Sequence, residues 1–110
     1  MRLPQAELAI IADEKLGGYL LSPSHAIGKE KAHWLAAVGF TPHHVAELRA
    51  ELLRLAREGE ARPAGVTSHG AKYAITAAIR APGGTRVEVR TIWIIDTGAV
   101  APRFVTCYPA

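Results

Sequence analysis

The sequence has few of the features that define export, metal binding or membrane insertion. It has one cysteine, Cys107, in 110 residues, so no intramolecular disulfide can form. The longest apolar stretch, around residues 92–95, is far shorter than the roughly 20 residues of a membrane-spanning helix. The first residues show no apolar signal followed by a cleavage site. We therefore expect a soluble, cytoplasmic protein with no membrane contact, and a buried, unreactive Cys107.

Several catalytic signatures are also missing from the sequence. There is no pair of carboxylates in a recognisable motif, no glycine-rich phosphate loop, no spaced set of zinc ligands and no Gly-x-Ser-x-Gly motif. The sequence gives no support to a glycosidase, a nucleotide hydrolase, a metalloenzyme or a serine hydrolase. We expect neither a metal nor a cofactor.

Positive charge is present, and it is unevenly distributed. The formal net charge is +3. Residues 1–60 contain seven Lys or Arg and eight Asp or Glu, whereas residues 61–110 contain six Lys or Arg and two Asp or Glu. A cationic surface attracts phosphates or an acidic protein. The alternative is that these six residues only form a solvated surface.

The first half of the chain carries helical patterns. Three helices are expected, over residues 12–21, 29–38 and 42–58. Thr41 is a suitable N-cap, Pro42 suits the first helical position, and Gly59 ends the longest pattern. The charged surface of that long helix is expected to be only solvated.

After Gly59 the period of apolar residues changes from that of a helix to that of a strand. Strands are expected over residues 60–67, 72–80, 86–96 and 103–108. Short turns join them, which is typical of an antiparallel meander. We therefore expect one α+β domain over residues 1–110, with the helices of residues 1–59 packed on one face of a sheet of three to four strands in residues 60–110. The other face of the sheet would be free.

Arg90 and two loop histidines are the candidate binding groups that the residues themselves suggest. Arg90 lies among apolar strand residues, so its guanidinium needs an anionic partner, either Glu88, Asp96 or a ligand phosphate. His25 and His69 are expected in loops, and histidine suits proton transfer near neutral pH. The remaining histidines do not have the spacing of a zinc site; they are His33, His43 and His44.

Motifs distributed along nearly the whole chain carry a resemblance to a known family. They are Lys15-Leu16-Gly17-Gly18-Tyr19-Leu20-Leu21-Ser22-Pro23-Ser24-His25, Gly28 with Lys31-Ala32, Gly39-Phe40, Gly70-Ala71-Lys72-Tyr73, Val89-Arg90-Thr91-Ile92-Trp93-Ile94-Ile95-Asp96 and Pro102-Arg103-Phe104-Val105-Thr106-Cys107-Tyr108-Pro109. With them the chain resembles an uncharacterised bacterial family, a domain of unknown function found free-standing and at the C-termini of polymorphic toxins. The order of helices and strands, ending in a Thr-x-Tyr-Pro strand, also resembles the ribonuclease superfold of barnase, EndoU and RelE-type toxins.

The resemblance implies that the free face of the sheet binds RNA. RNA cleavage without a metal needs a base for the 2′-hydroxyl, an acid for the 5′-oxygen, and cations around the phosphate. The catalytic residues implied are His25 as base or acid, Lys72 as electrostatic support, Arg90 as a phosphate clamp and Thr106 as a hydroxyl donor. The substrate-binding residues implied are Thr91, Arg103 as a second phosphate clamp, and Tyr108 as the alternative hydroxyl donor. The implied function is a toxin-type, metal-independent endoribonuclease that an acidic antitoxin or immunity protein neutralises.

Two other functions remain open at this point. A non-catalytic interaction module, one member of a small bacterial two-protein pair, would use the same sheet or its edge strand for docking. Such a module needs no catalytic histidine, and its strand arginines would be bound by Glu88 and Asp96. A small-molecule pocket between the sheet and the helices is the third possibility, for which the sequence offers only Trp34, Trp93 and apolar residues that a core needs in any case.

Overall fold

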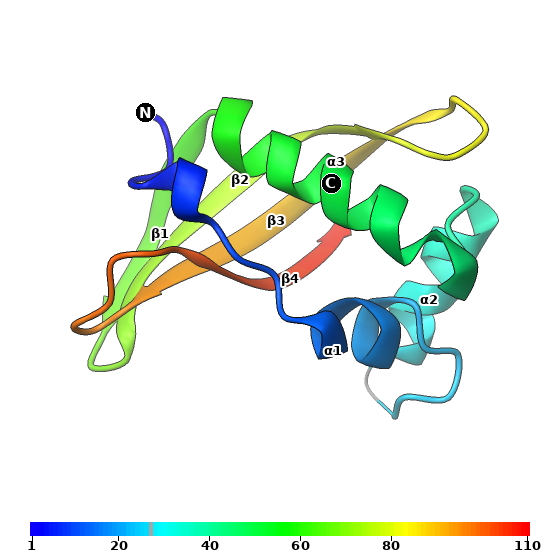
Figure 1. Ribbon diagram of the computed structural model, residues 1–110, viewed down its shortest axis with the longest axis horizontal. Coiled ribbons are helices and arrows are strands. Elements are labelled where there is room, and N and C mark those ends of the chain that lie inside the picture. The colour runs from blue at the N-terminus through cyan, green and yellow to red at the C-terminus, as the bar shows by residue number, and fades with distance from the viewer. Residues whose placement is uncertain (27) are drawn as a thin grey trace.

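The computed structural model describes residues 1–26 and 28–110 and confirms the α+β class. Helical segments fill the first half of the chain and strands the second (Figure 1). The helical segments are η1 (Ala6–Leu8), α1 (Asp13–Lys15), η2 (Leu16–Leu20), α2 (Lys29–Ala37), η3 (Pro42–His44) and α3 (Val45–Glu58). The strands are β1 (Ala61–Thr67), β2 (Gly70–Arg80), β3 (Arg86–Asp96) and β4 (Arg103–Pro109).

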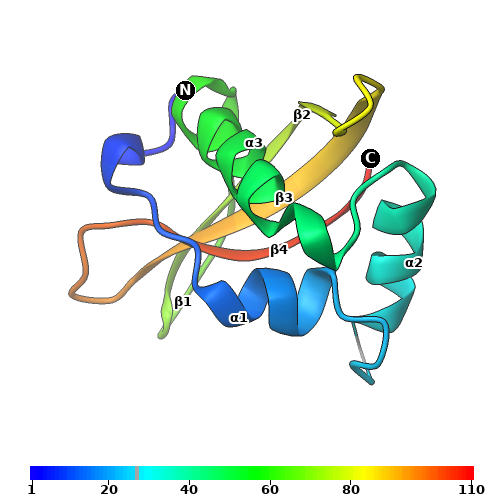
Figure 2. The same cartoon turned by 45° about the vertical axis from the view of Figure 1, so that its right-hand side comes forward.

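The strands form one four-stranded antiparallel sheet in the order β1-β2-β3-β4, as expected for a meander. Helix α3 lies across one face of this sheet, while α1 and α2 lie beside β4 (Figures 1 and 2). The segment before α1 also follows β4, because Ile10 and Arg103 form a parallel bridge. The helical half therefore covers one face of the sheet and its β4 edge. Helix α3 does not cover the opposite face.

Alternation along β3 determines which side chains enter the core. Val89, Thr91 and Trp93 are fully buried under the helices, and the residues between them belong to the other face. Trp93 contacts Phe104 of β4 edge-on, with ring centroids 5.3 Å apart. On the helical side, apolar residues at helical spacing complete the core; they are Leu48, Leu52, Leu55 and Ala56 of α3. The period of the apolar residues thus explains which side chains of β3 and of α3 enter the core.

Two of the expected helices differ in detail from the sequence pattern. The first begins as α1 and continues as a π-helical segment, η2, which contains Gly17 and Gly18. The long helix opens with the 3₁₀ turn η3, where the Thr41 hydroxyl accepts a hydrogen bond from the backbone N–H of His43. In the loop between η2 and α2, Ile27 lies outside the described residues. These local irregularities leave the order of the expected elements unchanged.

No helix in residues 1–26 or 28–110 is long and apolar enough to cross a membrane. Cys107 is completely buried in β4 on the core side of the sheet. Burial raises the pKa of its thiol to about 12, with a small opposing effect of Lys31. The thiol is therefore protonated near neutral pH and is shielded from reagents, in agreement with its expected inertness.

Candidate functional site

The sheet surface opposite α3, which we call the open face, carries most of the charged strand residues. Cross-strand partners lie on the same face of a sheet, and Arg90 pairs in register with Thr76 on one side and with Tyr108 on the other. Ile92 likewise pairs with Thr106. The polar residues that the register places on this face are Arg62, Thr67, Lys72, Thr76, Arg80, Arg86, Glu88, Arg90, Asp96, Arg103, Thr106 and Tyr108.

Lys31 of α2 reaches the β4 edge of the open face and is the centre of a cluster of hydroxyl groups. Its ammonium group donates to the Tyr19 hydroxyl at 2.8 Å and to the Thr106 hydroxyl at 2.6 Å. The two hydroxyls lie 3.3 Å apart. The ammonium also lies 5.2 Å from the ring centroid of Tyr19 and 5.8 Å from that of Tyr108, within range of cation–π attraction. We call Tyr19, Lys31, Thr106 and Tyr108 the Lys31 cluster.

The Lys31 cluster alters the acidity of Tyr19. Partial burial by itself would raise the pKa of the phenol, but hydrogen bonds with Lys31 and Thr106 and the positive charges of Lys31 and Lys15 lower this pKa below its usual value of 10.0. Lys15 lies 5.7 Å from the centroid of the Tyr19 ring. The surroundings of Tyr19 thus favour its phenolate, which is a proton acceptor.

Arg90 extends the positive charge of this site across the open face. Its Nε donates to the Tyr108 hydroxyl at 3.0 Å, so Tyr108 links Arg90 to the Lys31 cluster. Arg90 also borders a cavity of about 350 Å³ whose other lining residues are Glu60, Arg62, Pro63, Ala74 and Thr76. Glu88, which the sequence offered as a partner for Arg90, forms no ion pair with it among the described residues.

His25 lies beside Tyr19 of the Lys31 cluster. Its ring meets the Tyr19 ring edge-on, with centroids 5.2 Å apart. Its Nδ1 accepts a hydrogen bond from the backbone N–H of Gly28 at 2.9 Å. Nδ1 is therefore unprotonated, and the neutral ring carries its proton on Nε2. This tautomer makes His25 a hydrogen-bond donor at Nε2, whereas a base needs a lone pair there.

The structure places Arg103 and Lys72 away from the Lys31 cluster. Arg103 begins β4 and is opposite Ile94, which in turn pairs with Lys72. The guanidinium of Arg103 donates two hydrogen bonds to the Asp96 carboxylate, at 2.6 and 3.0 Å. This ion pair compensates the charge of Arg103, so of the two predicted phosphate clamps only Arg90 lacks a carboxylate among the described residues.

Thr91 lies on the core face of β3, although the resemblance assigned it to the substrate. Its side chain is completely buried. The hydroxyl donates to the backbone oxygen of Ile75 at 3.0 Å and accepts a hydrogen bond from the Trp93 indole at 2.9 Å. A ligand on the open face cannot contact this hydroxyl, so Thr91 supports the sheet and we leave it out of the site.

Tyr19 and Lys31 are the residues of the site that sequence reasoning missed. Both belong to motifs that carry the family resemblance, but nothing in their spacing shows that they meet Thr106, which is 87 and 75 residues away along the chain. Tyr19 and Lys31 reach Thr106 because η2 and α2 lie against the β4 edge. This arrangement can be seen only in the folded structure.

The geometry of the Lys31 cluster suits an anion better than a metal ion. Lys31 and Arg90 bring positive charge, and the groups bonded to them are hydroxyls. Within the described part of the chain, no group of three or more His, Cys, Asp or Glu side chains is placed to hold a metal. Hydroxyls and cations of this kind bind a phosphate and stabilise charge that develops on it.

Comparison with known proteins identifies the family but no activity. Residues 2–110 match the family described as a domain of unknown function (DUF6883), and the chain belongs to this family. No curated protein and no solved structure shows significant similarity to the chain.

Proposed function

We propose that the protein is a metal-independent endoribonuclease whose active site is the Lys31 cluster with Arg90 and His25. The observation that carries this proposal is the coordination of Lys31: an ammonium group held by two hydroxyls, at 2.8 and 2.6 Å, with no ion pair to a carboxylate in the part of the chain that the structure describes. A cation held in this way keeps its charge for an anionic ligand. The resemblance to toxin modules and to the ribonuclease superfold supports RNA as that ligand.

The reaction assigned to this site is attack of the ribose 2′-oxygen on the neighbouring phosphorus. The P–O5′ bond breaks, which yields a 2′,3′-cyclic phosphate and a 5′-hydroxyl. Negative charge grows on the phosphate oxygens in the transition state, and preorganised cations at that position lower the barrier. Lys31 and Arg90 are assigned to these oxygens, and Thr106 and Tyr108 fix the two cations by the hydrogen bond and ring contacts described above.

Tyr19 is assigned as the base that takes the 2′-hydroxyl proton. Its pKa is lowered, against the effect of its partial burial, by the hydrogen bonds of Lys31 and Thr106 and by nearby positive charge. His25, whose ring contacts that of Tyr19, is assigned to the leaving 5′-oxygen, which it hydrogen-bonds from Nε2 and which takes its proton from solvent. The resemblance implied His25 as base or acid; because the Gly28 N–H occupies Nδ1, the role of base is assigned to Tyr19 instead.

The test is incubation of the purified protein with total RNA and with a defined single-stranded RNA in the presence of EDTA. Cleavage to products with a cyclic phosphate end, lost in folded His25→Ala and Arg90→Ala variants, is the expected result. Arg57→Ala is the matched control, because Arg57 is an exposed arginine of α3, which covers the other face of the sheet. Intact RNA at every pH tested would overturn the proposal.

A toxin of this kind needs an inhibitor in the cell that makes it. The positive charge of the open face suits an acidic antitoxin or immunity protein, which would cover Lys31 and Arg90 and so compete with RNA. Growth arrest on induced expression in the bacterial cytoplasm, relieved by a co-expressed acidic neighbour from the same operon, is the expected result. Harmless expression of a soluble and folded chain would remove the toxin role.

The second candidate function is a non-catalytic interaction module, and one observation favours it. Arg103 is bound by Asp96, as expected if the strand arginines only support the sheet. Arg90, with a tyrosine hydroxyl as its partner, does not follow this pattern. A partner that binds equally well to wild type and to Lys31→Met, together with RNA that stays intact, would favour this function.

A further inference from the structure

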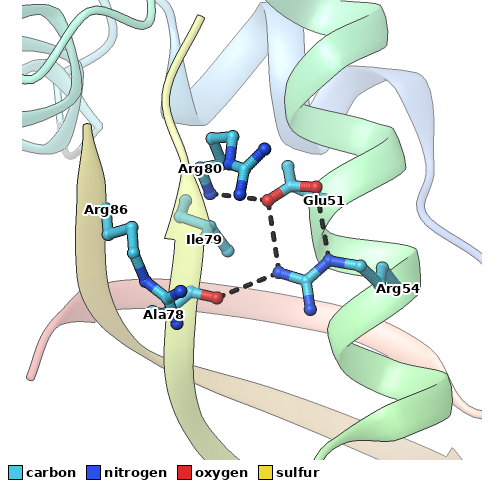
Figure 3. A pocket seen from close by; sticks show the side chains of 6 residues that line it. All are labelled: Glu51, Arg54, Ala78, Ile79, Arg80 and Arg86. Carbon is cyan, nitrogen blue, oxygen red and sulfur yellow. Dashed lines mark hydrogen bonds and ion pairs between the residues drawn. The ribbon is translucent and has the colours of Figure 1, made fainter. Parts of the chain in front are cut away.

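A second concentration of positive charge lies at the far end of the sheet from the β1–β2 turn, near the β2–β3 hairpin. There a cavity of about 350 Å³ is lined by Glu51, Arg54, Ala78, Ile79, Arg80 and Arg86. Figure 3 shows Glu51 and Arg54 on α3, facing the end of β2, with Arg86 on the neighbouring strand β3. Three arginines thus share the cavity with one glutamate. None of these residues belongs to the Lys31 cluster.

Arg80 and Arg86 are direct cross-strand partners at the end of the β2–β3 ladder. Both are exposed, and neither forms a salt bridge with a carboxylate among the described residues. Like charges directly opposite each other destabilise a pair of strands. An anion between the two guanidinium groups would remove this repulsion. This position therefore favours a bound anion on energetic grounds.

The one carboxylate of the cavity is already occupied. Glu51 accepts hydrogen bonds from Nε and Nη2 of Arg54, at 3.3 and 3.2 Å, and from the backbone N–H of Arg80 at 2.5 Å (Figure 3). Arg54 in turn donates to the Ala78 carbonyl at 3.0 Å. Partial burial works against ionisation of Glu51, but these hydrogen bonds and the charges of Arg54 and Arg80 lower its pKa. Glu51 thus forms its ion pair with Arg54, and neither Arg80 nor Arg86 forms an ion pair within the described part of the chain.

These contacts also explain why the cavity is there. Strand β1 begins at Ala61, opposite Ile75, so the end of β2 has no neighbouring strand on that side. Side chains of α3 take the place of the missing strand, as Arg54 binds the Ala78 carbonyl and Glu51 the Arg80 amide. A helix surface expected from sequence to be only solvated thus closes the sheet edge, and Arg80 and Arg86 border the opening that remains.

We infer that the cavity between α3 and the β2–β3 hairpin binds a phosphoryl group, held by Arg80 and Arg86. Each arginine offers two parallel N–H donors, and a phosphoryl group has enough oxygens to accept from both guanidinium groups, whereas a single carboxylate has only two oxygens and a chloride ion cannot be bound in this two-oxygen geometry. Glu88, opposite Ala78 on the open face, is the nearest further carboxylate in the register, and it does not line the cavity. The inference does not depend on the ribonuclease activity proposed above.

The test is a titration of the full-length ¹⁵N-labelled protein with inorganic pyrophosphate, at constant ionic strength set by chloride, followed through the arginine Nε–Hε signals. Saturable shifts at Arg80 and Arg86 are expected. Arg57, an exposed arginine near the end of α3 that does not line the cavity, is the internal control. Equal, unsaturable shifts at all three arginines would mean general charge screening and would overturn the inference.

Arg80→Gln and Arg86→Gln separate binding from folding. Each variant is expected to raise the Kd for pyrophosphate about tenfold, whereas Arg57→Gln leaves it unchanged. In chloride alone both variants are expected to melt at or above the temperature of the wild type, because the like-charge pair is gone. Only the wild type and Arg57→Gln are then expected to gain thermal stability from pyrophosphate. Variants that bind pyrophosphate like the wild type would contradict the inference.

The phosphoryl group can come from a nucleic acid chain or from a small phosphorylated molecule, and a second titration distinguishes these sources. Arg86 and Arg90 are four residues apart on β3, about 14 Å at strand spacing. A 2′-O-methyl oligouridylate of about 10 nucleotides, within the size range of single-strand sites, reaches both. The comparison probe is the dinucleotide of the same 2′-O-methyl uridylate. Tighter binding of the oligonucleotide than of this dinucleotide, weakened by Arg86→Gln, supports the pocket with a nucleic acid source. Equal affinities, lost in Arg86→Gln, support it with a small molecule.

Discussion

The two ends of β4 each lie beside a cation on the open face, Arg103 of β4 itself and Lys31 of α2, and the structure gives these two cations different partners. Arg103, at the start of β4, donates two hydrogen bonds to the Asp96 carboxylate. Three residues later, Thr106 accepts from Lys31, whose other bonded partner is the Tyr19 hydroxyl. The charge of Arg103 is compensated within the protein, while that of Lys31 is not.

This difference shows that the partner of a cation decides its role more than its strand or its face does. A carboxylate neutralises an arginine and leaves an exposed ion pair of little energetic value. A hydroxyl fixes the position of a cation and keeps its charge for a ligand. If this comparison is correct, substitutions at the two ends should have very different consequences.

Replacing Lys31 should produce the largest effect. Lys31→Met removes the charge assigned to the phosphate oxygens, and we expect RNA cleavage to fall about 100- to 1000-fold, the range for a lost transition-state donor. Lys29→Met, at an exposed lysine in the first turn of the same helix, is the control and should leave cleavage unchanged. Initial rates of cleavage of a fluorescent RNA measure both variants. Equal losses in Lys31→Met and Lys29→Met would contradict the role assigned to Lys31.

Tyr19→Phe should reduce cleavage about 100-fold, the order expected for loss of a general base. Because phenolate is the active form, the rate of the wild type should rise with pH up to the pKa of Tyr19, which lies below 10.0 through Lys31 and Thr106 despite the opposing effect of burial. In Lys31→Met the rise of the rate with pH should occur at higher pH, because the pKa of Tyr19 increases when the phenol loses a hydrogen bond and a nearby positive charge. A rise at the same pH in Lys31→Met and in the wild type would refute the assignment of Tyr19 as the base.

Thr91→Val should change stability without changing chemistry. Its hydroxyl is buried and bonds the Ile75 carbonyl and the Trp93 indole, so valine leaves both groups unpaired in the core. We expect the free energy of unfolding to fall by about 1–3 kcal/mol, measured by urea denaturation. Thr85→Val, at an exposed position, is the control. Cleavage per folded molecule of Thr91→Val should equal that of the wild type. A lower rate per folded molecule would show that Thr91 belongs to the active site.

Asp96→Asn should have the smallest effect, and none on cleavage. The hydrogen bond from Arg103 lowers the pKa of the Asp96 carboxyl below its usual 3.8, against slight desolvation. A lowered pKa means that the ion pair stabilises the fold above pH 3.8 and loses this effect as pH falls through the lowered value. The melting temperature of Asp96→Asn should thus lie slightly below that of the wild type at pH 7 and equal it in strong acid. A large loss of cleavage in Asp96→Asn would mean that the active site lies at the Asp96–Arg103 end of the open face.

The sequence predicted the fold well because period and turn signals are local. The change of apolar period at Gly59 and the turns between strands are enough to give the order of the elements. The face of Arg90 also follows from alternation, since Val89 and Thr91 are buried on either side of it. By the same alternation Thr91 belongs to the core, so the face of a strand residue is a better guide than its place in a motif.

The site itself was only partly predictable, because it depends on contacts between distant segments. The sequence named His25, Arg90, Thr106 and Tyr108, and the structure brings them near one another, but Lys31 joins them only through the position of α2 beside β4 (Figure 2). No local pattern shows that Arg103 meets Asp96 and not a ligand, because either one gives its guanidinium an anionic partner.

The proposed site lies at the Lys31 end of the open face, and NMR mapping of ligand binding tests this placement most directly. The ¹⁵N-labelled protein would be titrated with a 2′-O-methyl single-stranded oligonucleotide, which cannot be cleaved. We predict saturable shifts at Tyr19, Lys31, Thr106 and Arg90, and small shifts at Asp96 and Arg103. Shifts centred on Asp96 and Arg103, or no saturable shift at the Lys31 cluster, would contradict the account.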